Sequence, residues 1–210
     1  MQNIQNIIFD FGGVIINIDP DRIGTILAQK GVDNLLELHE HLFIKDIYKR
    51  LETGHVSPRQ FRDEIKSVIS IPVSDQDIDE AWNSIILDIP EERLRLLEAI
   101  KKNYRIYLLS NTNSIHFDFY NQYFARTFGY KGLSDLFEKA YFSHEMGLRK
   151  PNPEIFRVVL ADAGLSPEET LFIDDNAENV KVANDVGIQG HHLNDGTELT
   201  SLFKDDKLII

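Results

Sequence analysis

The sequence predicts an α/β protein in which a parallel sheet lies between two layers of helices and an all-helical domain is inserted into the chain. Two observations predict this fold. Short apolar runs that end in polar residues alternate with helical patterns over most of the chain, and a long segment after the first run is helical throughout. Strands that alternate with helices form right-handed βαβ units, which together give a Rossmann-like three-layer core.

Four apolar runs are expected to be strands of the sheet. Each is short and ends at a small polar or acidic residue, as a buried strand does when it enters a loop. A fifth strand is expected at residues 189–193, and the tail after Ser201 remains unassigned. The four runs are residues 7–9 before Asp10, 106–109 before Ser110, 139–142 before Ser143, and 171–173 before Asp174 and Asp175.

Helical patterns connect these strands. Residues 90–102 precede the second strand, and residues 113–124, 153–163 and 176–186 follow the second, third and fourth strands. Parallel strands need a crossover of this kind, because a tight hairpin cannot return the chain to the same end of the sheet.

The segment from Asp19 to about residue 90 interrupts the alternation. Its pattern is helical, and helix starts are expected at Asp19-Pro20, Ser57-Pro58 and Ser74, where a capping residue precedes a proline or an acid. The expected organisation is a core of residues 1–16 and 90–210 with a helical cap of residues 17–89.

The charge balance argues against polyanionic partners. The chain has 34 Asp and Glu against 22 Lys and Arg, and its formal charge of −12 repels nucleic acid and anionic membranes. It has no cysteine, which excludes disulfides, thiolate nucleophiles and zinc–thiolate sites. Neither a signal-peptide pattern nor a continuous apolar run of about 18 residues is present. We expect a cytoplasmic monomer or homodimer whose partner is a small metabolite.

The polar residues at the strand ends predict a site. The carboxyl ends of parallel strands meet at one edge of the sheet, and ligands bind there. Asp10, Asp174 and Asp175 would repel one another at this edge unless a cation neutralised them. An oxygen-only ligand set favours a hard ion such as Mg²⁺. The alternative is a carboxylate network that helix N-termini hold without a metal.

Lys150 is expected to add a positive charge to this site. It precedes Pro151, and proline disfavours helix in the residue before it, so Lys150 is expected in an extended segment. Beside an acidic metal site, Lys150 would pair with Asp10 in the free protein and with a phosphate group once substrate binds. The alternative is a solvated surface lysine.

Four segments resemble the ordered motifs of the haloacid dehalogenase-like superfamily. The resemblance covers residue 7 to about residue 188 and includes an insert of the length of that superfamily's helical cap. It is closest to the sugar-phosphatase branch, of which α-D-glucose-1-phosphate phosphatase is an example. The segments are D-F-G-G-V at 10–14, S-N-T-N at 110–113, G-L-R-K-P at 147–151 and F-I-D-D-N at 172–176.

The resemblance implies a Mg²⁺-dependent phosphatase that acts on a small phosphorylated metabolite such as a sugar phosphate. Asp10 is implied to attack phosphorus, to form an aspartyl-phosphate and to ligate Mg²⁺. The backbone carbonyl of Gly12 and the carboxylate of Asp175 are implied to be further ligands, and Asp174 to contact the ion through a water molecule.

Three residues are implied to hold the phosphate group. Ser110 and the backbone amide of Asn111 would bind phosphate oxygens, and Lys150 would neutralise the charge that develops there. These roles agree with the demands of phosphoryl transfer, which needs in-line positioning and electrostatic stabilisation more than elaborate bonding changes.

The sequence departs from the superfamily at Gly12. Most phosphatases of the superfamily carry a second Asp at this position as a general acid, and a general acid contributes about 10²–10⁴-fold to the rate. Three explanations stay open: an acidic leaving group such as an anomeric hydroxyl or an acyl phosphate, a proton from a cap residue or water, or a function other than phosphatase.

Two rival functions follow from the last explanation. A 2-haloacid dehalogenase shares the fold and the aspartate nucleophile but needs no metal, and the pair Asp174-Asp175 argues against it. A catalytically silent binding protein would not need to retain Asp10, Lys150 and Asp175 together.

The cap is expected to exclude water from the site and to select the substrate. Residues 50–57 place charges beside a glycine turn just before a helix. Glu52 is predicted to accept, and Arg50 to donate, hydrogen bonds to a substrate hydroxyl; an exposed corner between two helices is the alternative. Phe61 and Trp82 lie on apolar helical stripes and are expected in the core of the cap.

Overall fold

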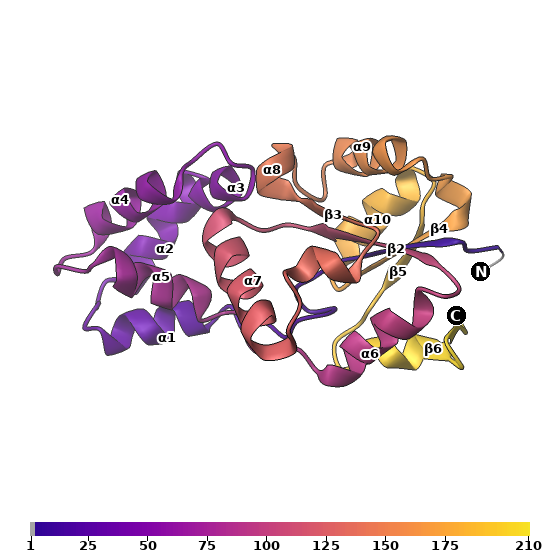
Figure 1. The fold of residues 1–210 in the computed structure, drawn as a ribbon. Helices are drawn as coiled ribbons and strands as arrows, with labels where there is room; N and C mark the ends of the chain where they lie inside the picture. Colours follow the sequence, from indigo (N-terminus) through magenta and orange to yellow (C-terminus); the bar gives the residue numbers. More distant parts are fainter. Residues whose placement is uncertain (1–2) are drawn as a thin grey trace.

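The computed structural model describes residues 3–210 and contains a five-stranded sheet. Its strand order is β3-β2-β1-β4-β5, and all neighbouring strands are parallel (Figure 1). The five strands predicted from the sequence are therefore present. Their bounds are β1 (Asn6–Phe9), β2 (Arg105–Ser110), β3 (Lys139–Phe142), β4 (Thr170–Asp174) and β5 (Gln189–His192).

Helices cover both faces of the sheet, because alternate residues of each strand point to opposite faces. Ile7 packs into the apolar cluster on one face, and its neighbour Ile8 packs into the cluster on the other. The predicted three-layer α/β core is confirmed. The first face is covered by α6 (Glu91–Ile100) and α7 (Ser114–Phe128), and the second by α9 (Pro153–Ala163) and α10 (Ala177–Asp185).

Three of these helices begin at asparagine caps. The side chains of Asn113, Asn152 and Asn176 accept backbone N–H groups from the first turns of α7, α9 and α10. α7 continues past the predicted residue 124 and ends where Gly129 adopts a φ of 76°. No helix over residues 3–210 has both the length and the apolar composition needed to cross a membrane.

Between β1 and α6 the chain forms a helical unit with its own apolar core. Phe61 and Trp82 are buried in this core, as predicted. α4 and α5 begin through capping boxes at Ser57 and Ser74, which are two of the predicted helix starts. The helices are α1 (Arg22–Gln29), α2 (Leu35–Ile44), α3 (Ile47–Glu52), α4 (Pro58–Val68) and α5 (Asp75–Asn83).

The first helix of this unit begins later than predicted. α1 starts at Arg22 instead of at Asp19-Pro20. The Asp19 carboxylate accepts the backbone N–H of Asp21 at 3.1 Å, and the Asp19 N–H donates to the Ile85 carbonyl at 2.9 Å. Asp19 therefore stabilises a turn before the helix, since an Asp side chain bonds the backbone two residues on in such turns.

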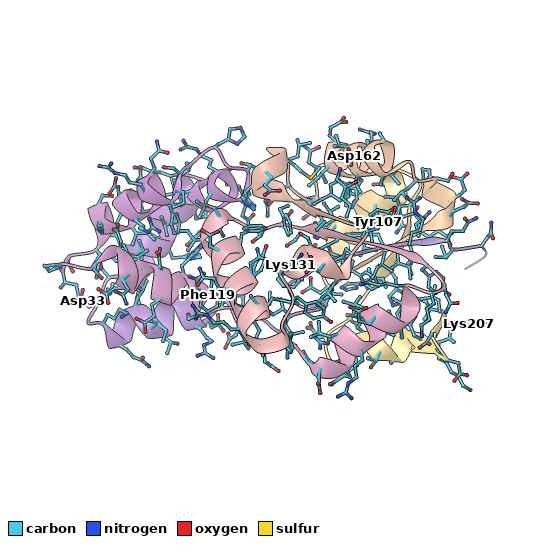
Figure 2. All side chains as sticks on the ribbon, viewed as in Figure 1. Asp33, Tyr107, Phe119, Lys131, Asp162 and Lys207 are labelled. Atoms are coloured by element: carbon cyan, nitrogen blue, oxygen red, sulfur yellow. The ribbon has the colours of Figure 1, made fainter. Side chains whose placement is uncertain are left out.

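Two chain segments that run side by side join the helical unit to the sheet. The Asn17 N–H donates to the Asp88 carbonyl, and the Leu87 N–H donates to the Asn17 carbonyl, both at 3.0 Å. The unit lies at one end of the molecule beside α7 (Figure 1), and Figure 2 shows Asp33 at its outer end, opposite Lys207. The paired connections hold the helical unit over the edge at which β1 ends.

The remaining elements are short and were not predicted. In the tail, β6 and β7 form a hairpin whose turn residues Asp205 and Asp206 have φ values of 50° and 60°, a region that Asp tolerates. The short elements are η1 (Leu133–Leu136), α8 (Ser143–Met146), η2 (Pro167–Glu169), η3 (Leu199–Leu202), β6 (Phe203–Lys204) and β7 (Lys207–Leu208).

Candidate active site

The strand order brings three of the polar strand ends together. β1 lies between β2 and β4, so Asp10, Ser110 and Asp174 end neighbouring strands at the same edge of the sheet. The strand order reverses at β1, because the chain continues to β2 and β3 on one side and to β4 and β5 on the other. Such a reversal leaves a crevice at the carboxyl ends of the strands, where open α/β sheets bind ligands.

Three carboxylates meet in this crevice. Asp10, Asp174 and Asp175 each place one oxygen so that all three oxygens lie within 4.8 Å of one another. Asp10 and Asp174 are buried, whereas Asp175 is exposed. Gly13, with a φ of 72°, makes room for this approach, since a Cβ at that position would collide with the Asp175 carboxylate.

Lys150 lies between two of these carboxylates. Its Nζ donates to Asp10 Oδ1 at 2.6 Å and to Asp174 Oδ2 at 2.7 Å, and the side chain is 1% exposed. The expected pair with Asp10 is therefore present, and a solvated surface lysine is excluded.

The segment around Lys150 is a turn and not the extended segment that was predicted. Lys150 lies in a turn that the Asn152 N–H closes by donating to the Arg149 carbonyl at 3.0 Å, and its peptide bond to Pro151 is cis. The Asn111 side chain bonds both backbone groups of Lys150, each at 2.9 Å. This amide from the end of β2 holds the turn against the sheet, a contact that local sequence preference does not predict.

The crowding of acids changes the pKa values at the site. Burial raises the pKa of Asp10 to about 7, with Asp174 and Asp175 adding to the rise and Lys150 opposing it. Burial also raises the pKa of Asp175, and Asp174 adds to this effect. Burial by itself would lower the pKa of Lys150, but the contacts with Asp10 and Asp174 outweigh it and raise the value. One lysine thus faces three acids, and the site favours an additional cation.

Two residues that the sequence did not single out support the acids. Asn179 of α10 donates from Nδ2 to both carboxylate oxygens of Asp174 at 3.1 Å, and the Asn176 N–H donates to Oδ1 at 2.8 Å. His192 at the end of β5 contacts the Asp175 carbonyl through Nε2 at 2.9 Å. The position of Asn179 in the first turn of a helix after a motif is a usable sequence signal; His192 gives none.

Ser143, which also ends a strand, does not join the crevice. Its Oγ accepts from the Thr112 N–H and donates to the Thr112 carbonyl, both at 2.9 Å, and the residue is fully buried. It therefore fixes the loop that follows β2, and only three of the four polar strand ends line the crevice.

A cavity of about 770 Å³ lies beside these groups, between the strand ends and the helical unit, although its lining does not include Asp10, Lys150, Asp174 or Asp175. Gly12, Ser110, Asn111 and Glu52 line it. Arg50 is exposed and is not among its lining residues, so the structure does not bring Arg50 to the site as predicted. The volume is in the usual range for a small-molecule site.

His116 is a cavity residue that sequence reasoning missed. Its ring stacks on Trp82 with centroids 5.3 Å apart, and its Nδ1 lies 3.0 Å from Asn83 Oδ1. Burial lowers the pKa of His116 to about 3, so the ring is neutral at physiological pH. The contact joins α7 to α5 and therefore the core helices to the helical unit.

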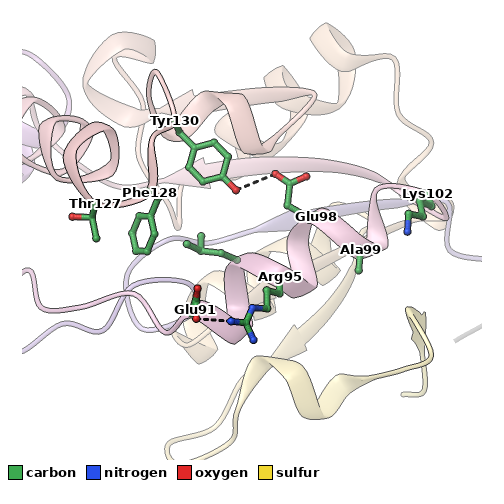
Figure 3. Close-up of a pocket in the computed structure, with 9 residues that line it drawn as sticks. Glu91, Arg95, Glu98, Ala99, Lys102, Thr127, Phe128 and Tyr130 are labelled. Atoms are coloured by element: carbon green, nitrogen blue, oxygen red, sulfur yellow. Dashed lines mark hydrogen bonds and ion pairs between the residues drawn. The ribbon is translucent and has the colours of Figure 1, made fainter.

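A second depression lies on the surface of α6 (Figure 3). Ionic and hydrogen-bonding groups line it, and four of them are already paired: Arg95 contacts Glu91 at 2.6 Å, and the Tyr130 hydroxyl donates to Glu98 at 3.3 Å. None of the residues predicted for the site lines it, so the cavity at the strand ends is the candidate active site.

Comparison with known proteins identifies the family. Residues 4–187 match the model of one family, haloacid dehalogenase-like hydrolase. The chain belongs to the haloacid dehalogenase-like hydrolases. The resemblance predicted from the four sequence motifs is thereby confirmed.

Relatives of this haloacid dehalogenase-like hydrolase match over nearly their whole length. It is 30% identical to D-ribitol-5-phosphate phosphatase of Bacteroides thetaiotaomicron over 93% of this chain and 94% of the relative. It is 28% identical to sesquiterpene phosphatase astK of Aspergillus oryzae over 90% and 89%. Its structure matches HAD family enzyme bt-2542 of B. thetaiotaomicron, solved with magnesium and inorganic phosphate, with a TM-score of 0.86, 41% identity and coverage of 96% and 100%.

An ion pair joins the helical unit of this hydrolase to the turn that carries Lys150. Glu52, at the end of α3, accepts from Arg149 Nε at 2.7 Å, and the two side chains are only 26% and 27% exposed. Burial raises the pKa of Glu52, and Arg149 opposes the rise. The following turn packs as closely, since a Cβ at Gly54 would lie 2.5 Å from the His144 carbonyl oxygen. Glu52 lines the cavity as predicted for a substrate contact, but its carboxylate is already bonded to Arg149.

Arg149 directly precedes Lys150, so its ion pair with Glu52 is expected to position Lys150. We therefore expect substitutions of Glu52 and Arg149 to have coupled effects on kcat/KM. In a double-mutant cycle with Glu52→Gln and Arg149→Met, each single variant is expected to lower kcat/KM, and the double variant to be little worse than either. The coupling should be about 0.5–1 kcal/mol, at the low end for contacting residues because the pair is partly solvated.

An exposed pair on α9 provides the control for this cycle. Arg157 and Glu154 lie 3.3 Å apart and are more than half exposed, so Arg157→Met and Glu154→Gln should show no coupling. Simple additivity of the Glu52 and Arg149 effects on kcat/KM would show that the ion pair does not position Lys150.

Proposed function

We propose that this chain is a Mg²⁺-dependent phosphatase that hydrolyses the monoester of a small phosphorylated metabolite, with a sugar or sugar-alcohol phosphate as the substrate class. The observation that carries the proposal is the contact of Lys150 with Asp10 and Asp174 at the strand ends, beside Asp175. A nucleophile, an acidic cation site and a buried positive charge meet there, which is the set that phosphoryl transfer needs. The D-ribitol-5-phosphate phosphatase relative supports the substrate class.

Mg²⁺ fits the donor set. The acids supply only oxygen, no cysteine is present, and three carboxylate oxygens within 4.8 Å of one another repel one another unless a cation neutralises them. We assign Asp10, Asp175 and the Gly12 carbonyl as direct ligands. Asp174 already accepts bonds from Lys150, Asn176 and Asn179, so we assign it an indirect role. When bound, Mg²⁺ neutralises negative charge on the carboxylates and on the phosphate group.

The residues of the chain have separate roles in the reaction. The Asp10 carboxylate attacks phosphorus, the bond from phosphorus to the leaving oxygen breaks, and an aspartyl-phosphate forms. Water attacks this phosphorus, releases inorganic phosphate and restores Asp10. Ser110 and the Asn111 amide hold phosphate oxygens, and Lys150 stabilises the charge that develops on them.

The proton for the leaving group does not come from position 12. A Cβ at Gly12 would lie 3.3 Å from Cδ1 and 3.6 Å from Cγ2 of Ile18, so an apolar side chain covers the space that a general acid would use. Water or a residue of the helical unit supplies the proton when the leaving group is an ordinary alcohol. An acidic leaving group, such as an anomeric hydroxyl, has less need of one.

We also propose that residues 17–89 form a cap over the site, and that residues 1–16 and 90–210 form the core, of which residues 1 and 2 lie outside the described part. The separate apolar core of the helical unit and the paired connecting segments support this division. The position of the cavity between the two parts supports a role for the cap in excluding water and selecting the substrate.

Rates of phosphate release test the proposal. With Mg²⁺, the protein is expected to hydrolyse p-nitrophenyl phosphate and at least one of D-ribitol 5-phosphate, glucose 1-phosphate and glucose 6-phosphate, and EDTA should abolish release. Preference for the 1-phosphate over the 6-phosphate would support the acidic leaving group, and the reverse order would exclude it.

Two results would replace this function with its rivals. Chloride release from 2-chloropropionate in EDTA, without phosphate release from any ester, would identify a dehalogenase. Binding of phosphate esters without any turnover would identify a silent binding protein.

A further inference from the structure

The cavity at the strand ends has two chemically different halves. Its floor carries the polar residues at the end of β2 and directly after it, which are Ser110, Asn111, Thr112 and Asn113. Its opposite wall is apolar and consists largely of side chains from α1, α2 and the segment before them. The partly exposed members of this wall are Ile18, Ile23 and Leu35, and behind them lie Leu27, Leu38 and Leu42, which are buried in the core of the helical unit.

The rim of the apolar wall is open. Leu36 of α2 lines the cavity and is 72% exposed, so an apolar surface continues from the cavity interior to the solvent. The space of about 770 Å³ exceeds what a phosphate group needs. A leaving group that fills it must therefore lie against leucine and isoleucine side chains.

The charges along the cavity disfavour a second anionic group on the substrate. Within residues 3–210, the charged residues that line it are the acids Asp21 and Glu52, while no lysine or arginine does. A second phosphate or a carboxylate would be desolvated beside these acids without a lysine or arginine to pair with. The cavity therefore favours a neutral leaving group.

From this wall and these charges we infer a further activity: hydrolysis of monophosphate esters with an apolar leaving group, of the alkyl or prenyl class. The inference rests on the proposed phosphatase function and uses the same reacting groups. A polyol reaches the polar floor but gains nothing from the apolar wall, where its hydroxyl groups would lose water without finding partners. An apolar chain gains from every methylene that it buries there.

An apolar ester is hydrolysed in the same two steps. Asp10 displaces the alkoxide from phosphorus, and the alkoxide takes a proton from water and leaves as the alcohol. Water then cleaves the aspartyl-phosphate, so one ester and one water give one alcohol and one inorganic phosphate.

A series of n-alkyl phosphates from butyl to octyl, each below its micelle concentration, tests the inference with wild-type protein and Mg²⁺. We expect kcat/KM to rise about threefold to fourfold with each added methylene until the cavity is filled, which corresponds to burial of one methylene at a time. p-Nitrophenyl phosphate and D-ribitol 5-phosphate are measured in parallel.

The parallel substrates separate the two proposals. A flat or falling alkyl series, with p-nitrophenyl phosphate still hydrolysed, would overturn the apolar substrate class and leave the phosphatase function intact. If none of the esters is hydrolysed, both proposals are overturned.

Variants at exposed positions test the wall without risk to the fold. Leu36→Asn is expected to lower kcat/KM at least about fivefold more for octyl phosphate than for butyl phosphate, because only the longer chain extends to the rim of the wall. Phe43→Asn is the matched control, because Phe43 lies on the same helix, is 71% exposed and does not line the cavity. Equal effects of the two substitutions on octyl phosphate would overturn the assignment of this wall.

Gly24 allows a second test from inside the cavity. It lies in α1, lines the cavity, and a Cβ there would meet only Leu35 Cδ1, at 3.9 Å. Leucine is a better helix former than glycine, so Gly24→Leu should fold at least as well as the wild type. In this variant kcat/KM is expected to stop rising at a shorter alkyl chain than in the wild type. A dependence of kcat/KM on chain length equal to that of the wild type would count against the inference.

Discussion

Asp10→Asn is expected to lower kcat for p-nitrophenyl phosphate by at least about 10⁴-fold, because the amide cannot form the covalent intermediate and nucleophile removal is among the most damaging changes to an enzyme. The fold should survive, since asparagine has the same shape and Lys150 keeps its contact with Asp174. Steady-state rates with Mg²⁺ and thermal unfolding of the same samples measure the two effects. Acid quenching with ³²P-labelled substrate should trap label on the wild-type protein and none on the variant.

Asp118→Asn is the control for charge. Asp118 is exposed on α7, outside the candidate site, and its substitution changes the net charge by the same amount. The kcat of this variant should stay within a factor of about two of the wild-type value, because surface substitutions usually have little effect. Undiminished turnover by Asp10→Asn, or label trapped on it, would disprove the role of Asp10.

Lys150→Met is expected to lower the free energy of unfolding by about 3–5 kcal/mol in EDTA, because it leaves Asp10 and Asp174 buried without their shared cation. Activity should be lost as well, since no positive charge remains to stabilise the phosphate group. Urea unfolding followed by fluorescence measures the stability. Lys150→Met combined with Asp10→Asn should recover part of the lost stability by removing one of the two unpaired charges.

The surface pair of Lys181 and Asp185 on α10 calibrates this result. The two groups are 2.8 Å apart, nearly as close as those at the site, but they are mostly exposed. Lys181→Met should therefore change the unfolding free energy by at most about 1 kcal/mol. A similarly small change for Lys150→Met would mean that the buried network does not stabilise the fold.

The fold and the central site were predictable because both depend on short-range patterns. A buried strand needs a continuous apolar run, and its end needs a polar residue, so the runs before Asp10, Ser110 and Asp174 were visible in the sequence. Parallel pairing then places such ends at one edge whatever the loop lengths are. Capping residues behaved in the same way: Ser57 and Ser74 begin helices because a hydroxyl satisfies an unpaired N–H within three residues.

Predictions failed where a side chain had several partners available. Asp19 resembled a helix cap, but it forms a turn that pairs with the segment before α6. Ser143 resembled a site residue, but its hydroxyl is used by the Thr112 backbone. Arg50 and Glu52 resembled a pair of substrate contacts, yet the first faces solvent and the second bonds Arg149. Sequence gives the chemistry of such a side chain but not the partner that reaches it.

By itself, then, the sequence determined the α/β sheet, the helical insert, the family and the acids and lysine at the strand ends. Only the tertiary structure decided the contacts across the cavity: Glu52 with Arg149, His116 with Trp82, and the apolar wall of α1 and α2 above the polar floor. These contacts join residues of the helical unit to residues of the α/β core, or line the cavity between the two, and their geometry depends on how the two parts pack. Local sequence patterns determine the helices and strands of each part, whereas the distance and angle between the parts decide which side chains are in contact.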